Sequence, residues 1–227
     1  MSTGNETESE VAAGHGEHPA FLAHHFHDAA QQKSAVKLGM WAFLVQEILF
    51  FAGLFMAYFA FRALYPETWL VAHELLDKRM GAFNTVVLLF SSLTMALAVR
   101  ACQLDDIKGS IRYLWITIAC ALGFMVVKYF EYSHKFHLGL LPGKYYSYDG
   151  IEGGAPELFF SVYFMMTGVH GLHVVIGVGI MVWLIFGPLR QGKVSSKYYA
   201  VVENTGLYWH LVDLIWIFLF PLLYLVR

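Results

Sequence analysis

Five long apolar runs dominate this chain and limit what it can fold into. They cover residues 38–61, 82–99, 113–130, 158–186 and 207–226. A helix needs about 20 residues to cross a hydrocarbon layer of about 30 Å, and these runs have that scale. In lipid the backbone N–H and C=O groups must be paired within the segment, as in an α-helix, and the alternating pattern of a membrane barrel is absent. The sequence therefore predicts an all-α fold, an integral membrane bundle of five transmembrane helices.

Composition supports a membrane protein and argues against several soluble classes. Hydrophobic residues make up 58% of the chain and charged residues only 14%, compared with about 25% charged residues in soluble domains. The net charge of -2 provides no basic face for nucleic acid, so we expect no nucleic-acid partner. Cys102 and Cys120 are isolated in the sequence, which favours neither a disulfide framework nor a thiolate metal site.

Two regions differ in polarity. Residues 1–35 form a polar, His-rich tail that we expect to be flexible or interfacial, and residues 36–227 form the transmembrane domain. A metal-binding tail is the alternative interpretation. The first apolar run begins too late and is too long for a cleaved secretory signal. The histidines of the tail are His15, His18, His24, His25 and His27.

The distribution of Lys and Arg predicts the orientation in the membrane. If the N-terminus is cytoplasmic, the tail and inner loops carry eight basic residues and the outer segments six. The inner loops are short, which is where the positive-inside rule applies best. We therefore expect a cytoplasmic N-terminus and, after five spans, a periplasmic or external C-terminus.

Glu47 is an acidic residue near the middle of the first span, about ten residues from its start. A charged side chain at that depth costs about 2.5–3.5 kcal/mol on insertion scales, so burial favours the neutral carboxyl. One interpretation is a neutral acid hydrogen-bonded to a neighbouring helix. The other is a proton-handling group, and the sequence leaves both open.

Polar side chains form a stripe on each of the last two spans. His170 and His173 share one helix face, while Glu203, His210 and Asp213 follow one stripe of the fifth span. Because each of these groups needs a polar partner in lipid, we predict an inter-helical polar seam between the two helices. Two histidines on one helix do not complete a metal site, and inter-helical hydrogen bonds are favoured for them.

The third span ends with Lys128 and Glu131, which are spaced to form an interfacial ion pair that snorkels to the outer surface. The span interiors contain only three histidines, too few for two haem ligations and a copper site. A di-iron bundle needs two Glu-x-x-His pairs and two further glutamates. Only Glu131 and His134 have that spacing. We therefore expect no catalytic residue and no metal ligand set in this chain.

Several segments resemble the cytochrome c oxidase subunit III family. Glu47, followed by Phe50 and Phe51, is similar to the family's span with a buried glutamate. The resemblance extends in order from about residue 37 to the C-terminus. Its further segments are residues 84–92, 131–132, 167–174 and 203–216.

This resemblance implies a non-redox accessory subunit III of a proton-pumping haem-copper terminal oxidase in aerobic respiration. It implies that the chain docks on catalytic subunit I, with subunit II in the same complex, stabilises the catalytic subunit and supports proton uptake. Haem and copper are expected in the partner subunits, and phospholipid is the only expected ligand of this chain. The expected location is the bacterial inner membrane, with a respiratory supercomplex as a further partner. The family's mitochondrial form has seven spans, and this chain resembles its last five.

Three alternatives stay open at this point. The nearest is subunit III of a cytochrome bo-type quinol oxidase, because the electron donor is chosen by other subunits. The second is a membrane metalloenzyme built from the polar residues of the last two spans. The third is a proton-coupled transporter, which usually contains an internal repeat, and no repeat is visible. The metalloenzyme's ligands would be His170, His173, His210, Glu203 and Asp213.

Overall fold

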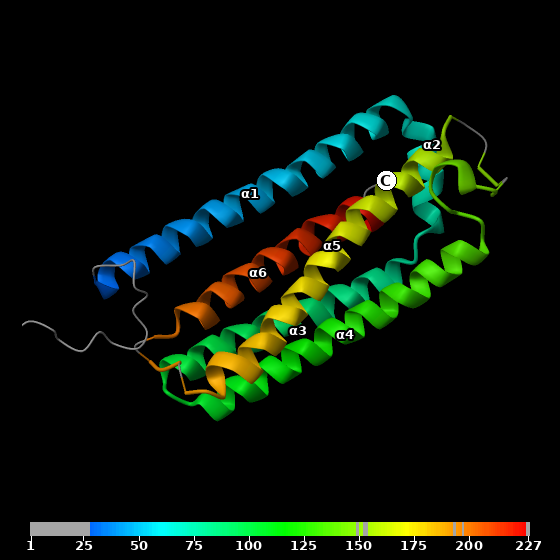
Figure 1. Ribbon diagram of the computed structural model, residues 1–227. Helices are drawn as coiled ribbons and strands as arrows, with labels where there is room; N and C mark the ends of the chain where they lie inside the picture. Colours follow the sequence, from blue (N-terminus) through cyan, green and yellow to red (C-terminus); the bar gives the residue numbers. More distant parts are fainter. Residues whose placement is uncertain (1–27, 149, 152–153, 193, 197, 226–227) are drawn as a thin grey trace, which may run out of the picture. The chain divides into compact units, whose positions relative to one another are not determined.

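The computed structural model describes residues 28–148, 150–151, 154–192, 194–196 and 198–225 (Figure 1). The chain divides into two units, Met1–Gly39 and Met40–Arg227, and each is described by itself. In the first unit the described residues form the beginning of helix α1. The Asp28 carboxylate accepts a hydrogen bond from the Gln31 backbone N–H at 2.6 Å, which caps this helix. The five tail histidines lie outside the described residues.

Within the part of the chain that the structure describes, five helices are long and apolar enough to span a membrane. Two of them, α5 and α6, continue into the short π-helices η3 (Ile185–Leu189) and η4 (Pro221–Leu225). The described residues contain two isolated β-bridges and no strand, which confirms the all-α class. The five helices are α1 (Ala29–Leu64), α3 (Lys78–Gln103), α4 (Ile107–His137), α5 (Pro156–Leu184) and α6 (Ala200–Phe220).

The helices extend beyond the apolar runs that predicted them. α1 begins at Ala29 rather than near residue 38, and therefore inside the segment expected to be a tail. α3 and α4 begin in polar loops because aspartates cap them. Asp77 accepts hydrogen bonds from two backbone N–H groups of the first turn of α3, and Asp106 accepts one from Gly109 at 2.9 Å. Hydropathy marks the part of a helix that lies in hydrocarbon, whereas caps mark its ends.

Three short helices were not predicted. They are α2 (Pro66–Ala72), η1 (His73–Leu75) and η2 (Gly143–Tyr145). Pro66 begins α2, where its missing N–H costs nothing. Within α2, Trp69 is buried and the Thr68 hydroxyl donates to the Gly154 carbonyl at 2.9 Å. These contacts hold α2 against the loop that precedes α5.

The helices α3, α4, α5 and α6 form the centre of the second unit. α3 packs along α4 and α6, and α5 packs along α6 and α4 (Figure 1). A Cβ atom at Gly177 would lie 2.8 Å from the Trp209 ring, so glycine is required where α5 meets α6. The part of α1 after Met40 inserts large side chains such as Phe51 and Tyr58, which are buried. The Tyr58 hydroxyl donates to the Leu222 carbonyl at 2.9 Å.

Large apolar side chains are exposed on every spanning helix. Examples are Leu49 on α1, Phe83 on α3, Phe130 on α4, Trp183 on α5 and Phe218 on α6. An aqueous surface of this kind would aggregate, whereas hydrocarbon solvates it. The exposed surface and the five apolar helices together define an integral membrane protein.

Candidate functional site

The structure joins Glu47 of α1 to His173 of α5. Glu47 Oε2 lies 3.0 Å from His173 Nε2, and both side chains are largely buried. The sequence identified both residues but predicted different partners for His173. The pair provides the polar contact that an acid at mid-membrane depth requires.

The other ring nitrogen of His173 determines how this pair carries protons. His173 Nδ1 lies 2.8 Å from the Val169 carbonyl oxygen. A carbonyl oxygen only accepts hydrogen bonds, so Nδ1 must carry a hydrogen. Nε2 then either accepts from a protonated Glu47 or, in the imidazolium, donates to the carboxylate. In both states one proton lies between Glu47 and His173.

Aromatic side chains hold His173 in place. The Phe51 ring meets the imidazole edge-on with centroids 5.1 Å apart, and Phe50 lies 6.3 Å away. The Tyr208 hydroxyl donates to the His173 carbonyl at 3.0 Å and so ties α6 to the same turn of α5. The pair also lines a cavity of about 470 Å³. The imidazole is therefore positioned by protein contacts while its partner acid borders open space.

His170 lies in a different environment from His173. It is fully buried, with the Trp216 ring 5.1 Å and the Phe124 ring 5.6 Å from its own ring. Neither ring nitrogen has a hydrogen-bond partner among the described residues. His170 therefore contacts α6 through an aromatic ring and not through a polar group.

The predicted polar seam between α5 and α6 is not formed. His210 Nδ1 lies 2.7 Å from the Ser92 hydroxyl of α3, and the Ser91 hydroxyl donates to Asp213 Oδ2 at 3.5 Å. Glu203 is half-buried in the first turn of α6. The polar stripe of α6 thus faces α3. Helix α6 packs between α3 and α5, and the polar side chains of α6 lie against the serines of α3.

Lys128 and Glu131 form the expected ion pair at 2.9 Å, and both side chains are buried within the protein. Three further residues complete this arrangement, which we call the Glu131 cluster. Lys135 Nζ donates to Glu131 Oε1 at 3.0 Å, and the hydroxyls of Tyr163 and Tyr224 donate to the same oxygen at 2.9 and 2.6 Å. The cluster joins α4, α5 and η4. Lys135 follows Glu131 at i+4 and was detectable from the sequence, whereas the tyrosines come from other helices.

One titratable group outside the spans has a shifted pKa. Hydrogen bonds from Ser196, first from its side chain and then from its backbone N–H, lower the pKa of Asp105. The backbone N–H lies 2.6 Å from Asp105 Oδ1. This contact links the loop after α3 to the loop before α6.

No group of three or more His, Cys, Asp or Glu side chains within the described ranges is arranged to hold a metal ion. Fold and site together define an integral membrane protein whose buried polar groups are dispersed in pairs and small clusters. The comparisons with known proteins identify its family. The chain belongs to the family described as cytochrome c oxidase subunit III, whose model matches residues 18–226. It is therefore an accessory, non-catalytic subunit of a haem-copper oxidase, as the resemblance implied.

Individual relatives agree with this assignment. The cytochrome c oxidase subunit 3 of Thermostichus vulcanus is 33% identical over 189 residues, which cover 83% of this chain and 86% of the relative. The quinol oxidase subunit 3 of Bacillus spizizenii is 30% identical over 192 residues, covering 83% and 86%. The heme-copper oxidase subunit I+III of Aeropyrum pernix is 30% identical over 203 residues, covering 86% of this chain and 23% of that protein.

Proposed function

We propose that this subunit supports proton uptake by the oxidase through the pair formed by Glu47 and His173. The observation that carries the proposal is the commitment of His173 Nδ1 to the Val169 carbonyl, which leaves one proton between the imidazole and the acid. Such a pair can accept or release a proton with a small movement of charge. A buried acid with this partner has the properties of a proton store or relay.

Substitution of Glu47 tests the proposal in the assembled oxidase. Glu47→Gln preserves the size of the side chain and its hydrogen bonding but removes the titrating group. We expect slower proton uptake or a shorter active lifetime, with a modest effect because oxygen chemistry lies in another chain. The measurements are turnover, proton pumping and inactivation rate. Unchanged values for all three would refute the proton role.

A matched control is available on α6. His210 is also an imidazole with one hydroxyl partner in the bundle, at 2.7 Å, but it has no acidic partner in the described structure. His210→Gln is therefore expected to leave proton uptake unchanged. A loss as large as that of Glu47→Gln would show that the assay responds to general damage in the bundle.

For the partners, we infer docking on catalytic subunit I, with subunit II in the same complex. Support comes from the Aeropyrum pernix relative, whose name joins subunits I and III in one protein. Haem and copper then belong to the partner subunits. Phospholipid is the proposed ligand of this chain, and a respiratory supercomplex is a further proposed partner. Co-purification with tagged subunit I tests this inference. Recovery of the subunit without any oxidase partner would contradict it.

Cytochrome c is the proposed electron donor, and quinol is the second candidate. Relatives named as a cytochrome c oxidase subunit and as a quinol oxidase subunit match this chain at 33% and 30% identity. The electron donor is determined outside this chain, so the subunit II that co-purifies with the chain distinguishes cytochrome c from quinol. A dithiolate copper site in that subunit supports cytochrome c, and its absence supports quinol.

The proposed topology has a cytoplasmic N-terminus and a periplasmic C-terminus in a bacterial inner membrane. It is supported by basic residues at the α3–α4 and α5–α6 connections, among them Arg100, Lys108, Arg112 and Arg190. Single cysteines in these connections should react with impermeant reagents only from the cytoplasmic side. Reaction from the periplasmic side would reverse the orientation.

A further inference from the structure

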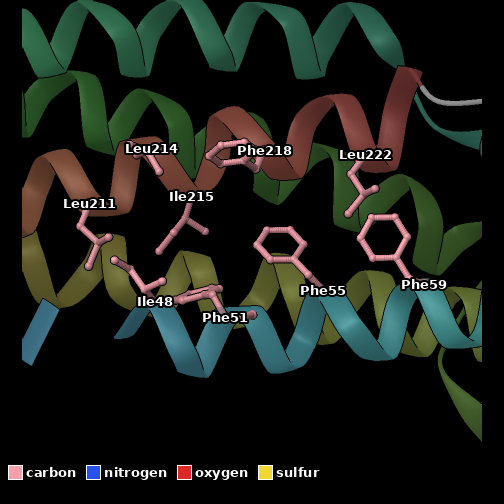
Figure 2. A pocket seen from close by; sticks show the side chains of 10 residues that line it. Ile48, Phe51, Phe55, Phe59, Leu211, Leu214, Ile215, Phe218 and Leu222 are labelled. Carbon is pink, nitrogen blue, oxygen red and sulfur yellow. The ribbon is translucent and has the colours of Figure 1, made fainter. Parts of the chain in front are cut away.

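Two hollows follow one another along α1 and α6 in the second unit. The first, called the head pocket, has a volume of about 470 Å³ and contains Glu47, His173 and Asn204 in its walls. The second, called the tail groove, has a volume of about 400 Å³ and is lined only by apolar side chains, including Phe55 and Phe218 (Figure 2). One hollow therefore offers hydrogen bonds and the other only apolar contact.

The two hollows are continuous along the helices. Phe51 lines the tail groove, and its ring packs against His173, which lines the head pocket. Glu47 and Ile48 are neighbours in the chain and line one hollow each. A single long molecule can therefore place a polar head in the first hollow and its chain in the second.

Two polar groups in the head pocket are uncommitted. Glu47 uses Oε2 for His173, so Oε1 is available, and the Asn204 side chain makes no hydrogen bond with a described residue. Thr205 and Tyr208 donate instead to backbone carbonyls. The free groups lie on opposite walls, α1 and α6, and supply both donors and acceptors.

Charge and depth restrict the head group that fits. No Lys or Arg lines either hollow, so a phosphate would find no cation. Glu47 lies about 14 Å along its helix from the start of the apolar run, whereas Asn204 lies near the beginning of α6. The head pocket therefore extends from near the membrane surface toward the middle of the hydrocarbon. The charged head of an ester lipid stays at the interface, whereas a neutral ring with a long chain can reach Glu47. Phe43 and Tyr208 provide aromatic faces for such a ring.

We propose that the head pocket and the tail groove together bind a long-chain quinol. Its hydroxyl groups bond to Glu47 Oε1 and the Asn204 amide, and its chain lies along Phe55 and Phe218. The proposal concerns binding alone, with no electron transfer at this site. It goes beyond the proton role of the Glu47 pair.

Photolabelling of the assembled oxidase tests the proposal. The probe is a quinol with an azide on its ring and a decyl chain, and labelled peptides of this chain are mapped after illumination. Because the azide is on the ring, we expect labels in the segments that line the head pocket, residues 40–47, 173–183 and 201–208, displaced by decyl quinol and not by phosphatidylglycerol. Ala52→Trp fills the tail groove and should reduce labelling about tenfold or more, while Asn204→Leu should reduce it about fivefold through one lost hydrogen bond.

The matched control is Ala60→Trp, which places the same side chain on an exposed position of α1 outside both hollows. The Ala60→Trp variant should be photolabelled to the same extent as the wild type. Displacement by phosphatidylglycerol, absence of label, or equal labelling of the two tryptophan variants would each overturn the proposal. Co-purification and oxygen consumption confirm that each variant is assembled. These two measurements also distinguish a failure of quinol binding from a failure of the proton role proposed for Glu47 and His173.

Discussion

Glu47 and Glu131 are both buried glutamates on membrane helices, but their surroundings differ. Glu47 has one side-chain partner, His173, and borders a cavity. Glu131 also lines a cavity, of about 310 Å³, but it accepts from two lysines and two tyrosines. Lys128 Nζ lies 4.7 Å from the Trp216 ring centroid. Four donors fix the geometry of the Glu131 carboxylate.

This difference separates the structural role of the Glu131 cluster from the proton role proposed for Glu47. The donors around Glu131 come from three helical segments, so the Glu131 cluster stabilises the bundle. The pair at Glu47 leaves one oxygen uncommitted and shares one proton, so it has the freedom to exchange. Burial alone therefore does not distinguish the two acids, whereas the number of their hydrogen-bond partners does.

The largest expected effect follows Glu131→Gln. Removing the charge leaves Lys128 and Lys135 buried without a counter-ion, which costs about 3–5 kcal/mol. We expect a strong decrease in the melting temperature and in the amount of subunit assembled with its partners. Glu203→Gln, at a half-buried position, is the control. Equal stability of Glu131→Gln and Glu203→Gln would contradict the structural role of the Glu131 cluster.

Tyr224→Phe should have an intermediate effect. It deletes the hydrogen bond of 2.6 Å to Glu131 and the contact of 2.8 Å with Lys128 Nζ, and the expected loss is about 1–2 kcal/mol. Thermal unfolding of the purified complex measures it. Tyr129→Phe, on the exposed surface of α4, should be silent, and a comparable loss there would argue against the cluster as the cause.

The two glutamates should also differ in reactivity. An apolar carbodiimide attacks protonated carboxyl groups, which the shared proton supplies at Glu47 and the four donors disfavour at Glu131. By peptide mapping we expect labelling at Glu47, none at position 47 in the Glu47→Gln variant, and none at Glu131. Preferential labelling of Glu131 would reverse the assignment of the two roles.

The fold was predictable because hydrocarbon imposes a simple rule on sequence. Runs of apolar residues identified all five spanning helices. The rule does not locate helix ends, which depend on caps such as Asp77 and Asp106, and it does not detect α2, which is too short to leave a hydropathy signal.

The site was predictable in its residues and not in its pairings. Glu47 and His173 were singled out because polar groups are costly in lipid, but their contact depends on the rotation of α1 relative to α5, which one sequence does not encode locally. For the same reason, the sequence did not predict that His210 and Asp213 contact α3 instead of α5. The pair of Lys128 and Glu131 did follow from helical spacing, because both lie on α4. Lys135 was not predicted, although it follows Glu131 at i+4 on the same helix.

The smallest expected effect concerns Asp105. It lies outside the membrane and belongs neither to the Glu131 cluster nor to the pair of Glu47 and His173. Its lowered pKa means that the carboxylate stabilises the link to Ser196 above its ordinary pKa, and that this contribution is lost as pH falls through the lowered value. Asp105→Asn keeps an acceptor and tolerates the positive φ of 60° at this position. Hydrogen exchange of the Ser196 amide should be a few-fold slower in wild type than in the variant at neutral pH, and equal in strong acid. A difference that persists in acid would contradict the assignment.

The most direct test of the account is a double-mutant cycle on proton uptake. Glu47→Gln, His173→Gln and the double variant are compared in the assembled oxidase by the rate of proton uptake during turnover. Because one proton belongs to the pair, removing either partner disables the same unit, and the double variant should be no slower than the slower single variant. Two independent, additive losses, or wild-type rates in all three, would contradict the claim that Glu47 and His173 act as one proton-handling pair.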